Sequence, residues 1–127
     1  MKKIITCLLT ILGLTSACGQ GKYENTDVQG FAELIADSSV VVLDVRTATE
    51  YSEGHIQGAI CIDQGQSDFL EKAKAALPTD KTIAVYCRSG RRSTNAADRL
   101  ADIGYKCVNL KGGIMAWTAE GMPVTKE

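Results

Sequence analysis

The sequence predicts a single α/β domain built on a mainly parallel β-sheet with helices on both faces. Segments with strand periodicity and segments with helix periodicity alternate from residue 26 to residue 123, and this alternation is typical of parallel sheets. The chain has 127 residues, of which 45% are hydrophobic and 23% charged, as in ordinary globular proteins. We therefore expect one domain, over residues 26–124.

The individual elements follow from the spacing of apolar residues. Val28, Phe31 and Ile35 fall at helical spacing, with Thr26 as the expected N-cap. An apolar run over residues 40–45 predicts a buried strand. The later elements are predicted in the same way, as strands at residues 59–62, 82–86 and 106–110 and helices at residues 69–77, 96–103 and 114–119. Active sites in parallel sheets lie at the carboxyl ends of strands, which here are the polar segments 44–46 and 87–92.

Residues 1–17 have the pattern of an export signal. Two lysines, Lys2 and Lys3, precede an apolar run over residues 4–14. That run is too short to span a bilayer comfortably, but it fits the hydrophobic region of a signal peptide. We therefore expect the mature protein in the cell envelope.

Cys18 follows small residues at the end of this segment and resembles the lipidated cysteine of a bacterial lipoprotein. In such signals cleavage occurs before the cysteine and its thiol receives a diacylglycerol, so the protein would be held at a membrane through Cys18. Residues 18–25 would then be the lipidated cysteine and a short polar tether. The alternative is an ordinary secretory signal, cleaved near Ala17 or Gly19, which would leave a soluble periplasmic protein.

Composition and cysteine usage argue against several function classes. With 14 basic and 15 acidic residues, the chain has no excess of positive charge for binding nucleic acid. It has one histidine and no Cys-x-x-Cys pair, so we expect no metal site and no cofactor. Three cysteines, Cys61, Cys87 and Cys107, lie in the predicted domain. An odd number leaves at least one free thiol, in a compartment that favours disulfides.

The cysteine that ends a predicted strand, Cys87, is followed by a tight loop and a helix that begins near Ser93. Gly90 permits a positive φ, and inward-pointing loop amides together with a helix N-terminus form an anion cradle. Such surroundings lower the pKa of a thiol, and the thiolate is the nucleophilic form. Forked donors for an anionic substrate are available from three loop arginines, Arg88, Arg91 and Arg92. The alternative is a buried cysteine beside a solvated basic turn.

Residues 86–93 (YCRSGRRS) resemble the active-site loop of rhodanese domains. The segments LDVR, EY and GHIQGA within residues 43–59 resemble the N-terminal signature of that family, and NLKGGI with a following tryptophan, within residues 109–117, resembles its C-terminal one. The resemblance extends over residues 26–124. It implies the three-layer rhodanese fold, with five strands in a mainly parallel sheet, and an enzyme of the sulfurtransferase class.

The resemblance also implies a double-displacement mechanism. The Cys87 thiolate would take the outer sulfur of thiosulfate or of a persulfide donor, hold it as a persulfide and pass it to a thiol acceptor. The substrate-binding residues would be those of the loop, namely Arg88, Ser89, Gly90, Arg91 and Arg92. The loop amides would cradle the terminal sulfur and Arg91 and Arg92 would hold a sulfonate, while Arg88 points to solvent.

Three other functions are alternatives to this interpretation. Dual-specificity phosphatases share the fold, but their loop is one residue longer and ends on an arginine; this chain has Ser93 at that position, which favours sulfur over phosphate. A carrier would hold sulfur on Cys87 for a partner, with little turnover of small donors. An envelope thiol-redox domain would use Cys87 to form mixed disulfides.

Two charged residues at the end of the strand over residues 40–45 match family positions and would support the site. We expect Asp44 and Arg46 to form ion pairs that fix the neighbouring loop, with Glu50 as a further partner. The histidine, His55, matches a loop-packing position of the family, and the remaining two cysteines of the domain are expected to be buried small hydrophobes.

Overall fold

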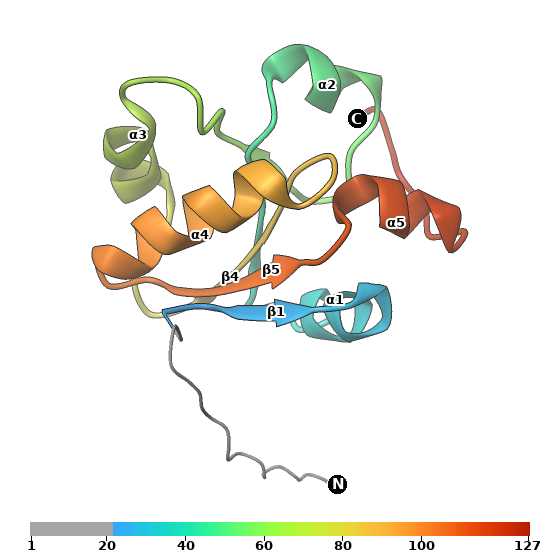
Figure 1. The fold of residues 1–127 in the computed structure, drawn as a ribbon, viewed down its shortest axis with the longest axis horizontal. Helices are drawn as coiled ribbons and strands as arrows, with labels where there is room; N and C mark the ends of the chain where they lie inside the picture. The colour runs from blue at the N-terminus through green and yellow to red at the C-terminus, as the bar shows by residue number, and fades with distance from the viewer. Residues whose placement is uncertain (1–21) are drawn as a thin grey trace, which may run out of the picture.

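A computed structural model describes residues 22–127, in which helices cover both faces of one five-stranded β-sheet (Figure 1). The strands, all parallel, are β1 (Glu24–Thr26), β2 (Val41–Asp44), β3 (Ile60–Cys61), β4 (Thr82–Tyr86) and β5 (Lys106–Leu110). The helices are α1 (Val28–Ile35), α2 (Ala48–Glu53), α3 (Phe69–Ala76), α4 (Arg91–Asp102) and α5 (Gly113–Ala119). The strand order is β1-β5-β4-β2-β3. This architecture confirms the predicted fold class.

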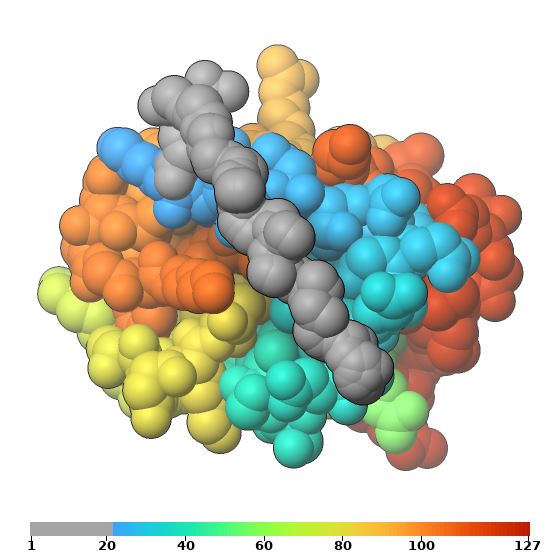
Figure 2. All heavy atoms as spheres, turned by 90° about the horizontal axis from the view of Figure 1, so that it is seen from below, coloured from blue at the N-terminus to red at the C-terminus, as the bar shows by residue number. Residues whose placement is uncertain are grey.

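Alternation along the central strand β4 divides the core into two layers. Ile83 and Val85 pack on the side of α3 and α4, while Ala84 and Tyr86 pack on the side of α1 and α5. Figure 2 shows α1 and α5 side by side over the second of these faces. Because both faces are covered, the strand is buried and hydrophobic from Ile83 to Tyr86, as expected of a buried parallel strand.

The predicted N-cap of helix α1, Thr26, is wrong: the structure places Asp27 at that position. Thr26 is the last residue of β1, where it pairs with Leu110 of β5, so its backbone already belongs to the sheet. Asp27 accepts a hydrogen bond from the Gly30 amide on its Oδ1 at 2.9 Å, which satisfies one of the free amides at the helix start.

The sequence pattern does not predict two of the elements, β1 and α2. Strand β1 is a short edge strand of polar residues, so no apolar alternation marks it, and it begins at Glu24, inside the predicted tether. Helix α2 buries none of its residues. It is held by a capping box, in which the Glu50 amide donates to Thr47 Oγ1 at 3.2 Å and the Thr47 amide donates to Glu50 Oε1 at 3.0 Å.

All strands end at the same edge of the sheet because all run parallel. Asp44 at the end of β2 is in register with Tyr86 at the end of β4, so the two polar segments predicted as the site begin side by side. Residue 22 lies at the opposite edge, where Lys22 Nζ contacts the carboxylate of Asp102, the last residue of α4, at 2.7 Å. The site and the start of the described chain are therefore at opposite poles (Figure 1).

Within residues 22–127, no helix has the length and apolar character needed to cross a membrane. The predicted signal over residues 1–17 and the lipidated Cys18 lie outside the described residues.

Candidate active site

Cys87 is the first residue after β4, at the edge where the strands end. It continues the alternation of β4 into the core layer beneath α3 and α4, so the residue is only 1% exposed. The chain then turns through Arg88, Ser89 and Gly90 before α4 begins at Arg91. Within this turn the Gly90 amide donates a hydrogen bond to Cys87 Sγ at 3.1 Å. Strand β4 therefore delivers a thiol into a turn of backbone amides at the start of a helix.

The surroundings of Cys87 favour the thiolate. Burial by itself would raise the pKa of this thiol, but the Ser93 hydroxyl and the backbone amides of Ser93, Gly90 and Ser89 stabilise the negative charge. The result is that the pKa of Cys87 lies below its usual value. The Ser93 hydroxyl is fully buried and makes no hydrogen bond of ordinary geometry within residues 22–127, so it is free to donate to the Cys87 sulfur.

Two glycines let the loop close against α5. Gly90 adopts a φ of 105°, in the region that favours glycine. Gly113, with a φ of 62°, sits directly on the loop: the next amide, Ile114 N, donates to the Cys87 carbonyl at 2.9 Å. A Cβ added to Gly113 would lie 2.6 Å from that same carbonyl oxygen. Glycine is therefore a packing requirement here, because a side chain would displace the Cys87 peptide.

The three loop arginines differ in their contacts. Arg92 forms a bidentate ion pair with Glu50, with distances of 2.8 Å from Nη1 to Oε1 and 2.9 Å from Nη2 to Oε2. The hydrogen bond from Arg92 lowers the pKa of Glu50 to about 2. Arg88 and Arg91 are exposed, and their guanidinium groups make no hydrogen bond or ion pair within residues 22–127. Of the two arginines predicted to hold a sulfonate, Arg92 is thus already held by a carboxylate.

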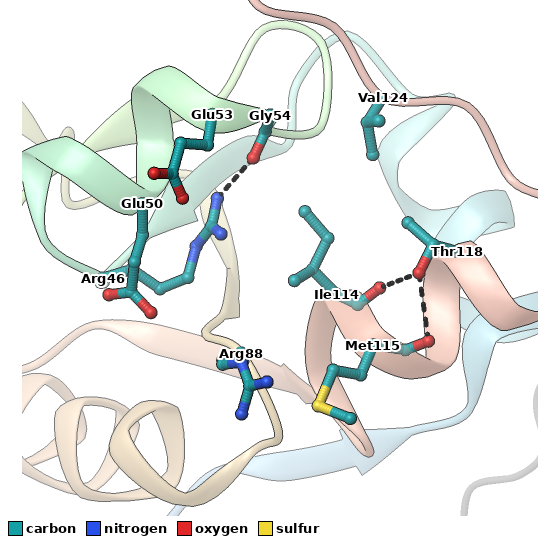
Figure 3. A pocket seen from close by; sticks show the side chains of 9 residues that line it. All are labelled: Arg46, Glu50, Glu53, Gly54, Arg88, Ile114, Met115, Thr118 and Val124. Carbon is teal, nitrogen blue, oxygen red and sulfur yellow. Dashed lines mark hydrogen bonds between the residues drawn. The ribbon is translucent and has the colours of Figure 1, made fainter.

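A pocket of about 260 Å³ opens beside the loop, between α2 and α5 (Figure 3). The residues that line it are Arg46, Glu50, Glu53, Gly54, Arg88, Ile114, Met115, Thr118 and Val124. Its α5 wall is attached to the cysteine loop, because the amides of Ile114 and Met115 donate to the carbonyls of Cys87 and Arg88 at 2.9 and 3.1 Å. Arg88, which was expected to point to solvent, lines this pocket although it is exposed.

Comparison with known proteins identifies the architecture. The family described as the rhodanese-like domain matches residues 27–120, a span that contains the Cys87 loop and most of the sheet. The chain belongs to the rhodanese-like family.

Relatives of this rhodanese-like domain include named sulfurtransferases. A sulfurtransferase of Allochromatium vinosum is 34% identical over 100 residues, which cover 77% of this chain and 91% of the relative. Thiosulfate sulfurtransferase 18 of Arabidopsis thaliana is 34% identical over 108 residues, covering 76% and 79% of the two chains. A solved structure of a rhodanese-related protein from Thermoplasma volcanium is 37% identical and superposes with a TM-score of 0.74, covering 83% of this chain and all of that one.

Asp44 and Arg46 support the site of this rhodanese-like domain as a buried ion pair. The distance from Arg46 Nη2 to Asp44 Oδ2 is 2.6 Å, and the same nitrogen donates to the Gly54 carbonyl at 2.8 Å. The pair therefore ties the end of β2 to the turn after α2, the structural role that the sequence predicts. The expectation that Glu50 joins this pair is wrong, because the capping box holds the Glu50 carboxylate at the start of α2, where it meets Arg92.

His55 packs and does not face the cysteine loop. Its ring stacks on Tyr51 with centroids 3.6 Å apart. Its Nδ1 lies 2.8 Å from the Tyr51 carbonyl and its Nε2 lies 3.0 Å from the Glu127 carbonyl oxygen. These contacts agree with the loop-packing position that the resemblance implied.

The other two cysteines of the domain lack the surroundings of Cys87. Cys107 is buried within β5, and burial raises its pKa to about 12. Cys61 is half-buried, which is less than expected, and burial together with the charge of Asp44 raises its pKa to about 11. None of the three cysteines within residues 22–127 forms a disulfide.

Proposed function

We propose that this rhodanese-like domain is an enzyme that moves a sulfane sulfur from thiosulfate or a persulfide to a thiophilic acceptor, through a persulfide on Cys87. The observation that carries the proposal is the position of the buried Cys87 thiol at the start of α4, where it accepts a hydrogen bond from the Gly90 amide at 3.1 Å and its pKa is lowered. A buried cysteine with a purely structural role has its pKa raised, as at Cys107. The names of the relatives, sulfurtransferase and thiosulfate sulfurtransferase, support the same chemistry.

The reaction consists of two displacements at sulfur. The Cys87 thiolate attacks the outer sulfur of thiosulfate, the S–S bond of the donor breaks, and sulfite leaves with the bonding electron pair. Cys87 then carries a persulfide, whose terminal sulfur is held by the amides and hydroxyl that stabilise the thiolate. An acceptor thiolate attacks that terminal sulfur, and Cys87 is released as the thiolate. No metal or redox cofactor takes part in either step.

The substrate-binding roles follow the contacts of each side chain. Arg88 lines the pocket and is free to bind an anion. Arg91 is exposed at the start of α4, outside the residues that line the pocket, and offers a second cation. Arg92 acts through its pair with Glu50, which fixes the first turn of α4, and the backbone of Ser89 and Gly90 supplies hydrogen-bond donors to the sulfur.

The proposal is tested by thiocyanate formation from thiosulfate and cyanide, with the purified protein reduced beforehand. Cys87→Ser should abolish turnover, while Cys107→Ala, a matched change of an equally buried cysteine, should retain it. Sulfur that loads on Cys87 from a polysulfide without turnover of thiosulfate would favour the carrier alternative. Absence of both turnover and loading would contradict sulfur transfer and favour a thiol-redox role.

We also propose that the protein is attached to a membrane of the cell envelope by a lipid on Cys18. The support is the sequence of residues 1–18 and the position of residue 22, at the pole opposite Cys87, which would direct the site away from the membrane. In a bacterial host, a radiolabelled fatty acid should be incorporated into the wild-type protein and not into Cys18→Ser. An unlabelled, cleaved wild-type protein in the periplasmic fraction would contradict the anchor and support the secretory alternative.

A further inference from the structure

The pocket that Arg88 of the cysteine loop lines is balanced in charge, although the loop sequence suggests a strongly basic site. Two of the arginines around it are already neutralised, since Arg46 is paired with Asp44 and Arg92 with Glu50. The pocket is therefore not the purely cationic, anion-binding site that three loop arginines would form.

Two side chains of opposite charge in this pocket have no partner within residues 22–127. Arg88 on the cysteine loop and Glu53 on α2 both line it, and neither side chain has an ion-pair or hydrogen-bond partner within the described part of the chain. Figure 3 shows them entering from different elements, with Glu53 on the α2 side and Arg88 on the loop side. A ligand between them meets a cation at one end and a carboxylate at the other.

Three apolar side chains line the rest of the pocket together with Thr118, and two of the three are exposed. Met115 is 49% exposed and Val124 is 44% exposed, and Ile114 lies beside them. Large exposed apolar side chains beside a concave polar site usually contact a ligand or a partner. Inorganic thiosulfate has no carbon that such a wall could cover, so the wall favours a donor or acceptor with a carbon skeleton.

We infer that this pocket selects a small zwitterionic organic thiol and its persulfide, with Arg88 binding the carboxylate and Glu53 binding the ammonium group. The inference rests on the proposed sulfur transfer and names its substrate class. Met115 and Ile114 cover the carbon skeleton of the ligand. A pocket of about 260 Å³ is below the range of about 300–1,000 Å³ common for drug-sized ligands, so the molecule is small.

The chemical step with such a donor needs no further reactant. The Cys87 thiolate attacks the outer sulfur of the donor persulfide R–S–SH, a new S–S bond forms to Cys87, and the S–S bond of the donor breaks. The thiolate R–S⁻ leaves with the electron pair of that bond, and the proton of the donor stays on the terminal sulfur of the Cys87 persulfide. The sulfane sulfur keeps its oxidation state, so nothing is oxidised or reduced overall.

The test compares kcat/KM for three donors in the purified protein: cysteine persulfide, N-acetylcysteine persulfide and thiosulfate. N-acetylcysteine keeps the carboxylate and lacks the ammonium group. Glu53→Gln should lower kcat/KM about 5- to 10-fold for cysteine persulfide alone. It should leave N-acetylcysteine persulfide unchanged and raise kcat/KM for thiosulfate about 2- to 3-fold, because a repelling charge is removed. Glu71→Gln, a change of an exposed carboxylate on α3, is the matched control and should have no effect.

A second variant tests the other end of the ligand. Arg88→Gln should lower kcat/KM for both organic persulfides alike, since both carry the carboxylate. If Glu53→Gln changes none of the three donors, or lowers all three equally, the zwitterion inference is overturned while sulfur transfer by Cys87 stands. Failure of the proposed function itself would look different, because no donor would load sulfur on Cys87 in the wild-type protein.

Discussion

Cys87 and Cys107 lie on neighbouring strands of one sheet, in one core layer, and each is only 1% exposed. Their thiols nevertheless differ in the direction in which the pKa moves: burial raises that of Cys107 to about 12, whereas that of Cys87 is lowered. Burial is common to both, so it cannot be the cause of the lowered pKa of Cys87.

The two cysteines differ in whether the backbone amides around them are already hydrogen-bonded within the sheet. Cys107 is inside β5, in register with Ile83 of β4, so the nearby amides are used in the sheet. Cys87 is one residue beyond the end of β4, where the amides of the turn and of the first turn of α4 have no strand to pair with. The end of a parallel strand thus supplies donors that the middle of a strand cannot, which is the physical reason that the site lies there.

We expect the largest effect when each of the two cysteines is replaced in a separate variant. Cys87→Ser should lower sulfur transfer on the order of 10³-fold or more, because the nucleophile is lost. Cys107→Ala should retain activity and lose about 1 kcal/mol of unfolding free energy, from the small cavity it leaves. Steady-state kinetics and urea denaturation check the two results, and comparable activity loss in both variants would contradict the distinction.

The next effect comes from the contact that holds the loop in place. Gly113→Ala should cost about 2–4 kcal/mol of unfolding free energy and most of the activity, because the added Cβ meets the carbonyl groups of Cys87 and Arg88. The matched control is Gly121→Ala, at a φ of 79°, where an added Cβ meets no atom within 4 Å. It should cost only about 1 kcal/mol, for the backbone conformation. Equal losses in thermal or urea unfolding would show that the close packing of Gly113 is unimportant.

We expect a smaller effect from removing the Ser93 hydroxyl, which stabilises the thiolate of Cys87 and has no counterpart at Cys107. Ser93→Ala should raise the pKa of Cys87 and slow its alkylation by iodoacetamide about 3- to 10-fold at pH 7, with rates that converge at high pH. Ser89→Ala is the matched control, because Ser89 contributes through its backbone amide. An unchanged pH profile for Ser93→Ala would mean that the amides alone stabilise the thiolate.

The smallest effect concerns the ion pair that fixes the first turn of α4. The pKa of Glu50 is lowered to about 2 from an ordinary 4.5, so its contribution to stability is complete above pH 4.5 and is lost as the pH falls toward 2. Glu50→Gln should therefore lower the unfolding free energy by about 1 kcal/mol at pH 7, since the pair is partly exposed, and by less at pH 3. In urea titrations, a pH-independent loss in Glu50→Gln would contradict the role of the ion pair.

Much of the fold could be predicted because its strands are buried on both faces. Strands β4 and β5 begin and end where the sequence predicts, because most of their residues are buried and apolar. The exceptions are Thr82 and Lys106 at the strand starts and the buried Asn109. Strand β1 has polar residues because it is an edge strand, and α2 lacks an apolar stripe because only Tyr51, which is partly buried, packs against the core. The spacing of Thr47 and Glu50, typical of a capping box, was the one available signal for α2.

The candidate site could be predicted only as far as local sequence reaches. The position of Cys87 at a strand end and the loop glycine follow from a few consecutive residues. The partner of Arg92 lies 42 positions away, at Glu50, so no local pattern could show that this loop arginine is neutralised. The same holds for Glu53, which lines the pocket only because α2 and the cysteine loop form two of its sides.

The most direct test of the account maps where sulfur is loaded. Trypsin places the three described cysteines, Cys61, Cys87 and Cys107, on three different peptides, so one digest of the purified protein after treatment with a persulfide donor reports on all of them. We expect the added mass of one sulfur atom on the Cys87 peptide alone, removable by cyanide. Loading on Cys61 or Cys107 to the same extent, or on no peptide, would contradict the claim that the turn after β4 makes Cys87 the sulfur-carrying nucleophile.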